Sequence, residues 1–157
     1  MKKIDSIIIH CSATRAGQDI KAKDIDRMHR ARGFSQIGYN YVIDLDGTIE
    51  AGRPLTIAGA HCIGYNDHSV GICYIGGLDT SGKPADTRTP AQKTAMDGLI
   101  NKLMREYEIA VLLGHRDTSR DLNDNGIVEP FEWIKLCPCF DVREEYKSFL
   151  KPIIVQS

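Results

Sequence analysis

The stretch Ile4-Asp5-Ser6-Ile7-Ile8-Ile9-His10 decides the fold of this chain. Its apolar, β-branched run predicts a strand. Because the isoleucines follow one another without alternating polar residues, the strand is expected to be buried on both faces. Strands of this kind lie inside sheets that helices cover. The stretch ends at His10, so it also carries an imidazole to the end of a central strand.

Strands and helices alternate along the rest of the chain. Strands are predicted at residues 39–44, 48–51, 69–75 and 110–113, and helices at 21–32, from residue 90 onward and at 142–150. Asp46-Gly47 is a tight-turn signal that joins the first two of these strands into a hairpin, and Thr89 before Pro90 is a helix start. The residues at helical spacing that are expected to face the core from 21–32 are Ala22, Ile25, Met28 and His29. The sequence therefore predicts an α/β fold, a single domain with a central mixed β-sheet flanked by helices.

The bulk composition excludes several classes of protein. The 157 residues are enough for one domain with its own core, and 42% of them are hydrophobic and 26% charged. A net charge of −1 gives no attraction towards nucleic acid or an anionic membrane, and the apolar runs are too short to cross a bilayer. Asp5 and His10 interrupt the stretch that follows Met1-Lys2-Lys3, so no export signal is expected. We expect a monomer with no nucleic-acid or membrane partner.

The five cysteines do not form the framework of a disulfide-rich domain, because they are scattered and odd in number. Cys11 and Cys73 lie in apolar strand contexts and are interpreted as buried small hydrophobes. A disulfide between Cys62 and Cys73 stays open at this point. Cys137 and Cys139 flank a single proline, which is too tight a spacing for paired zinc ligands, so at most one of them is expected to bind metal.

His10, His115 and Cys137 form a candidate metal site. Each histidine follows the carboxyl end of a predicted strand, where functional residues of such sheets gather. Two imidazoles and one thiolate supply three zinc ligands, and a zinc with three protein ligands keeps a fourth position for water, as catalytic sites do. Against this, a lone histidine more often satisfies a local hydrogen bond, which is our interpretation of His29. On the residues alone, both interpretations of the candidate site stay open.

Two further side chains could assist an open zinc in hydrolysing an amide. Zinc lowers the pKa of its water and polarises a carbonyl, and the reaction then needs an oxyanion stabiliser and a proton donor or acceptor. Lys135 is two residues from Cys137 and could place a cation against the oxyanion, and Tyr39 could offer a phenol. The structural alternatives are a solvated surface lysine and a core aromatic.

A series of short motifs runs in order through nearly the whole chain, from about Ile7 to Asp141. The motifs are His10-Cys11-Ser12-Ala13-Thr14, Gly38-Tyr39-Asn40-Tyr41, Asp46-Gly47-Thr48-Ile49-Glu50-Ala51-Gly52-Arg53, Ala60-His61, Gly64-Tyr65-Asn66, Ser69-Val70-Gly71-Ile72, Thr89-Pro90-Ala91-Gln92, Gly114-His115-Arg116 and Lys135-Leu136-Cys137-Pro138-Cys139-Phe140-Asp141. Together they resemble the zinc-dependent N-acetylmuramoyl-L-alanine amidases of the phage-lysozyme type. That superfamily also includes the animal peptidoglycan recognition proteins.

The resemblance implies a reaction and a cofactor. The family cleaves the amide between the lactyl group of N-acetylmuramic acid and L-alanine of the peptidoglycan stem peptide, so peptidoglycan or a muropeptide is the expected substrate. The implied cofactor is Zn2+, and water activated by the zinc attacks the lactyl carbonyl. The implied zinc ligands are His10, His115 and Cys137, and the implied catalytic residues are Tyr39, which orients water or passes a proton, and Lys135, which stabilises the oxyanion. His61 matches a histidine near the family's substrate groove and is expected to contact substrate or to support a metal ligand.

The chain departs from the family between His115 and Lys135, where an insertion at about residues 117–133 is rich in Asp, Asn and Gly. It fits the calcium-loop pattern D-x-[DN]-x-[DN]-G-x5-E. The Ca2+ ligands would be the side chains of Asp121, Asn123, Asn125 and Glu132 and the carbonyl of Ile127. The alternatives are a surface turn that fits the pattern by chance, and an insertion that shapes the substrate groove with Phe131 and Trp133.

Two other functional classes fit parts of the sequence. One is a protein that binds peptidoglycan or muropeptide without cutting it; relatives of that kind lack the ligand cysteine, which is present here as Cys137. The other is a Cys/His hydrolase with Cys11 or Cys137 as nucleophile, which is disfavoured because neither follows a helix N-terminus that would lower its pKa. The leading expectation is a protein made in the cytoplasm that acts on the cell wall, by phage-type release or by export with a removed leader.

Overall fold

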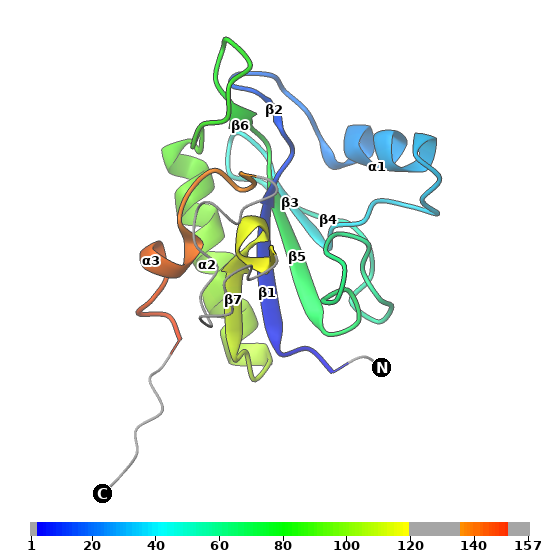
Figure 1. Cartoon of the computed structure of the whole chain (residues 1–157), viewed down its shortest axis with the longest axis vertical. Helices are drawn as coiled ribbons and strands as arrows, with labels where there is room; N and C mark the ends of the chain where they lie inside the picture. Colours follow the sequence, from blue (N-terminus) through cyan, green and yellow to red (C-terminus); the bar gives the residue numbers. More distant parts are fainter. Residues whose placement is uncertain (1–2, 120–135, 151–157) are drawn as a thin grey trace, which may run out of the picture.

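A five-stranded mixed sheet organises the protein (Figure 1). The computed structural model describes residues 3–119 and 136–150. The strands of the sheet follow the order β4-β3-β5-β1-β7, with bounds β1 Ser6–Cys11, β3 Tyr41–Ile43, β4 Ile49–Ala51, β5 Ser69–Tyr74 and β7 Val111–Gly114. β3 and β4 form the predicted antiparallel hairpin, and the other neighbours pair in parallel.

β1 lies inside the sheet, between β5 and β7, and all six of its residues are buried. This confirms the strand expected from the isoleucine run. A second sheet has only two short strands, β2 (Thr14–Arg15) and β6 (Gly77–Leu78), which pair in parallel just beyond the carboxyl ends of β1 and β5. It was not expected, because two residues are too few to give a periodic pattern.

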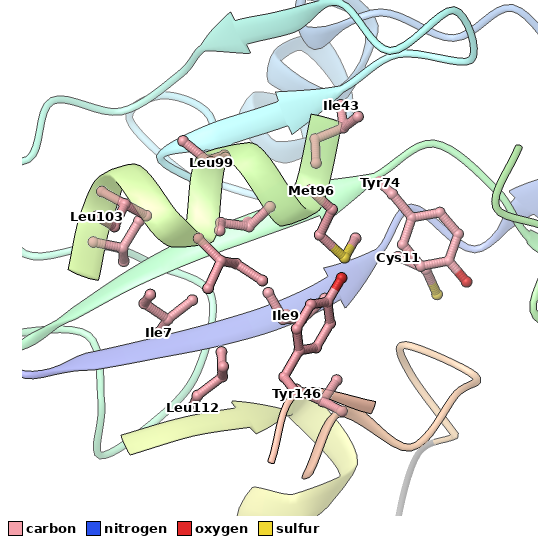
Figure 2. Close-up of a cluster of buried hydrophobic side chains, with 14 of the residues drawn as sticks. Ile7, Ile9, Cys11, Ile43, Tyr74, Met96, Leu99, Leu103, Leu112 and Tyr146 are labelled. Carbon is pink, nitrogen blue, oxygen red and sulfur yellow. The ribbon is translucent and has the colours of Figure 1, made fainter. Parts of the chain in front are cut away.

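Helices cover the two faces of the main sheet. α2 (Pro90–Glu106) packs on one face, where Met96, Leu99 and Leu103 join Ile7 and Ile9 in the larger core cluster (Figure 2). α1 (Ala22–Ala31) packs on the other face through the buried Ile25. Successive strand residues point to opposite faces of a sheet. In β1 and β5, every second residue faces α2, and the residues between them face α1. His10 is one of them.

The start of α2 and the buried face of α1 follow the sequence signals, except at one residue of α1. Thr89 caps α2 by accepting a hydrogen bond from the Gln92 N–H at 3.1 Å, and the Gln92 amide donates to the carbonyls of Ile43 and Ile75. The first turn of α2 is thereby fastened to the ends of two strand segments. On α1, Ile25 and His29 are buried as expected, but Met28 is 44% exposed. The expectation that Met28 faces the core was therefore wrong.

The chain after β7 turns at once into a short 3-10 helix, η1 (His115–Thr118), and the described part resumes at Leu136. α3 spans only Val142–Glu145, whereas a helix was expected over residues 142–150. The Tyr146 N–H still donates to the Val142 carbonyl, but the Phe149 N–H then donates to Tyr146 three residues back, so the chain continues as a turn. The Tyr146 side chain is buried in the larger core cluster, where its hydroxyl donates to Asp97 of α2 at 2.7 Å. Among the described residues, no helix is long and apolar enough to span a membrane.

Candidate active site

His10, His115 and Cys137 meet at the carboxyl edge of the main sheet. His10 lies in β1 and His115 directly follows β7, its parallel neighbour, so the strand order alone brings the two imidazoles together. Their ring centroids are 4.7 Å apart. One ligand atom from each of these two residues and the Cys137 sulfur all lie within 4.8 Å of one another. The structure therefore brings together the three residues that the sequence predicted as metal ligands.

Backbone hydrogen bonds hold Cys137 in this position. The Cys11 N–H donates to the Cys137 sulfur at 3.2 Å, and the Arg116 N–H donates to the Cys137 carbonyl at 2.8 Å. These two hydrogen bonds fix the Cys137 sulfur and backbone beside the two histidines. The sulfur of Cys139 faces the Gly77 carbonyl instead, at 3.4 Å. Only one of the two closely spaced cysteines thus reaches the cluster, as expected.

Tyr39 lies beside the cluster, with its ring centroid 5.0 Å from that of His10. The residue is half-buried, and desolvation of its hydroxyl, together with the nearby thiols of Cys73 and Cys137, raises the pKa of Tyr39 well above its ordinary value. Tyr39 is therefore a neutral phenol that can donate a hydrogen bond. The interpretation of Tyr39 as a purely core aromatic does not hold, since it lines the cavities next to the cluster.

His29 supports Tyr39 from α1. Its Nδ1 accepts a hydrogen bond from the Gly38 N–H at 2.9 Å, and its ring lies 5.3 Å from the Tyr39 ring. Burial lowers the pKa of His29, helped by the charges of Arg32 and Arg53, so the ring stays neutral. This agrees with its interpretation as a histidine that satisfies a local hydrogen bond.

Two cavities of about 290 Å³ each flank the cluster. Both are lined by Tyr39, His115 and Arg32, while Cys137 lines one and His61 the other. They provide space for a substrate on either side of the imidazole of His115. A larger cavity, of about 580 Å³, is lined by the end of α2 and the residues before β7. It lies at the opposite edge of the sheet and contains none of the candidate ligands.

His61 contacts a candidate ligand directly, because its Nδ1 lies 2.8 Å from Nε2 of His10. Cys62 and Cys73 are both free, as are the other three cysteines, so the structure contains no disulfide between them. Lys135 lies outside the described residues. The same holds for the candidate calcium ligands Asp121, Asn123, Asn125, Ile127 and Glu132.

Comparison with known proteins decides the family. The sequence model of the N-acetylmuramoyl-L-alanine amidases (Amidase_2) matches residues 1–127. The chain belongs to this amidase family. The matched part contains His10, Tyr39, His61 and His115 and ends before Cys137.

Relatives of this amidase match over most of their length. The endolysin of Escherichia phage T7 is 38% identical over 144 residues, which cover 92% of this chain and 86% of the relative. Among solved structures, the amidase LysC from Clostridium intestinale is 30% identical with a TM-score of 0.71, covering 95% of this chain and 86% of LysC. Drosophila PGRP-LB is 27% identical with a TM-score of 0.68, covering 99% and 88% of the two chains. The amidase is thus an α/β enzyme of the group that acts on peptidoglycan.

Proposed function

We propose that this amidase uses zinc to cleave the amide between the lactyl group of N-acetylmuramic acid and L-alanine of the peptidoglycan stem peptide. The observation that carries the proposal is the convergence of His10, His115 and Cys137, whose ligand atoms lie within 4.8 Å of one another beside two cavities. We further propose that the protein works as a monomer, made in the cytoplasm, that reaches the cell wall by phage-type release or by export with a removed leader.

The residues present fit zinc. Two imidazoles and a thiolate are ligands that zinc prefers, and three protein ligands leave a fourth position for water or substrate. The Cys11 N–H donates to the Cys137 sulfur and holds it towards the two imidazoles. A zinc ion held there would supply Lewis acidity to activate water and polarise the amide carbonyl.

Two side chains would handle the charge and the protons of the reaction. Because its raised pKa keeps Tyr39 protonated, the phenol would donate a hydrogen bond, orienting water or stabilising negative charge on the substrate oxygen. Lys135, which lies outside the described residues, is proposed to stabilise the oxyanion. The half-buried position of Tyr39 keeps its donor partly desolvated, where such a bond is stronger than in water.

A second candidate function is recognition of peptidoglycan without cleavage. The likeness to Drosophila PGRP-LB, whose name denotes a recognition protein, supports a muropeptide-binding groove as readily as an active site. The presence of a thiol at position 137, within reach of both histidines, favours the enzyme.

The test combines metal content with product release from purified peptidoglycan sacculi. We expect about one zinc per chain, release of new L-alanine amino termini, and loss of activity in EDTA. Cys137→Ser should lose zinc and activity together, whereas Cys139→Ser is the matched control and should keep both, because its sulfur faces Gly77. Lys135→Ala should keep zinc and lose most of its turnover. Activity that persists in EDTA would refute the zinc mechanism, and sacculi bound without new amino termini would establish the recognition function.

A further inference from the structure

His61 is half-buried and packs against β5 and the loop before it. On β5, Val70 and Ile72 belong to the cluster packed on α2, so Ser69 and Gly71 point to the opposite face, the one that His10 also faces. A Cβ built on Gly71 would lie 2.6 Å from Cγ of His61, and one built on Gly59 would lie 2.7 Å from its Cδ2. The missing side chains of two glycines therefore make a slot that the imidazole fills.

The slot is itself held by hydrogen bonds. The Asn40 amide oxygen accepts from the Gly71 N–H at 2.8 Å, and the Asn40 N–H donates to the Gly71 carbonyl at 2.9 Å. The Asn66 carboxamide oxygen accepts from the backbone N–H groups of His61 and Cys62, at 2.8 and 2.9 Å. Hydrogen bonds thus hold both Gly71, which forms one wall of the slot, and the backbone of His61. The imidazole of His61 is thereby kept in one orientation.

Both nitrogens of His61 are engaged in a line that leads to the metal cluster. Nδ1 lies 2.8 Å from Nε2 of His10, and Nε2 lies 3.1 Å from the hydroxyl of the fully buried Ser69. Because Nε2 of His10 faces His61, a metal held by His10 would be bound through Nδ1. With a metal on Nδ1, His10 would donate its Nε2 proton to Nδ1 of His61, and His61 would donate to the Ser69 hydroxyl.

We propose that His61 and Ser69 act as positioning residues that hold His10 in its metal-binding tautomer and orientation. Metal-binding histidines almost always give their second ring N–H to an acceptor, and loss of that acceptor typically weakens metal binding roughly 10- to 100-fold. Here the His61 imidazole stands in the place of that acceptor. The inference rests on the proposed zinc function and assigns His61 to the metal rather than to the substrate.

The test measures zinc affinity of the full chain by competition with a chromophoric chelator. His61→Leu, which removes the acceptor, should bind zinc roughly 10- to 100-fold more weakly. His61→Asn places an amide oxygen near the position of Nδ1 and should restore most of the affinity. Ser69→Ala should show a smaller loss, because His61 can still accept from His10. His68→Leu is the matched control, since His68 pairs with Asp67 at the surface and should not affect zinc.

Kinetics separate positioning from substrate contact. With zinc in excess, His61→Leu should recover most of its kcat with KM unchanged. Unchanged zinc affinity combined with a raised KM would overturn the inference and make His61 a substrate contact. If His61→Leu does not fold, the other two variants decide. The inference would be overturned if Ser69→Ala bound zinc as tightly as the wild type while His61→Asn bound zinc as weakly as Cys137→Ser. Wild-type protein that binds no zinc would instead refute the proposed function itself.

Discussion

At the scale of single residues, the protonation of the buried His29 affects the position of Tyr39. Its Nδ1 accepts the Gly38 N–H just before Tyr39, and its ring packs against the phenol ring. Protonation would replace this acceptor with a second donor, so the native arrangement requires the neutral ring. Burial provides it by lowering the pKa of His29 below its ordinary value of 6.5.

The sign of the resulting pH dependence follows from linkage. Above pH 6.5 His29 is neutral in both the folded and unfolded states and adds no pH dependence. As the pH falls below that value, the unfolded state takes up the proton first, so stability is lost until the lower folded pKa is passed. His29→Asn keeps an acceptor for Gly38 without titrating, so its unfolding free energy should fall less between pH 7 and 5. Urea unfolding measures this, and parallel pH curves for the two proteins would contradict it.

The sequence could predict that His10 and His115 lie close together because the logic of strand ends is local and general, whereas Cys137 entered the predicted set through its thiol and the family resemblance. Two histidines that follow adjacent parallel strands must lie close together. The contact between His61 and His10 could not be predicted, since 51 residues separate them and the slot consists of side chains that are absent. A glycine in the sequence indicates that a side chain would not fit there, but it does not indicate which neighbouring residue occupies the space.

At the scale of elements, Arg88 fastens the segment before α2 to α3. Its guanidinium is almost fully buried, forms paired hydrogen bonds with Asp86 and Glu145 at 2.7 to 2.9 Å, and lies 3.4 Å from the centroid of the Phe140 ring. Phe140 follows the segment that carries Cys137. The Arg88 contacts therefore hold α3 and the ligand-bearing segment against the core.

Removal of Arg88 should destabilise the fold. Arg88→Ala leaves two carboxylates without their partner, and we expect a loss of about 2 to 3 kcal/mol in unfolding free energy, because both acids partly reach solvent. The hydrogen bond from Arg88 lowers the pKa of Glu145 below 4.5, so this part of the stability exists above that pH and is lost as pH falls through the lower folded value. The deficit of the variant should therefore shrink in acid. Arg105→Ala on exposed α2 surface is the control, and a deficit no larger than in this control would disprove the role of Arg88.

Element prediction succeeded where periodicity was long and failed where tertiary contacts decide. β1, the hairpin and the start of α2 follow from the isoleucine run, from Asp46-Gly47 and from Thr89-Pro90. α3 is shorter than its apolar pattern indicates: after Tyr146 the backbone turns with a bond from Phe149 to Tyr146, and Tyr146 contacts Asp97 of α2, which no local pattern marks. The burial of Arg88 could not be predicted, because its partner Glu145 lies 57 residues away and no local pattern marks it.

At the scale of the whole molecule, the candidate metal site joins both ends of the described chain. Its ligands come from β1, from the residue after β7 and from the segment before α3, so the unfolded chain cannot present them together. A metal bound to these ligands stabilises the folded state alone, and its binding free energy becomes folding free energy. The insertion predicted at about residues 117–133 would separate two of the ligands along the chain, and its calcium loop stays a prediction.

Zinc should therefore raise the melting temperature of the whole domain. At free zinc 100 times its Kd the gain is about 2.7 kcal/mol, which corresponds to roughly 5 to 10 °C for a domain of this size. Cys137→Ser should abolish the rise and Cys139→Ser should keep it, as scanning calorimetry can measure. Calcium bound to the predicted loop would act through different residues, so a rise with millimolar calcium that survives Cys137→Ser but not Glu132→Gln would report that loop. Equal melting temperatures with zinc and with EDTA in the wild type would mean that the three ligands do not hold a metal in the folded protein.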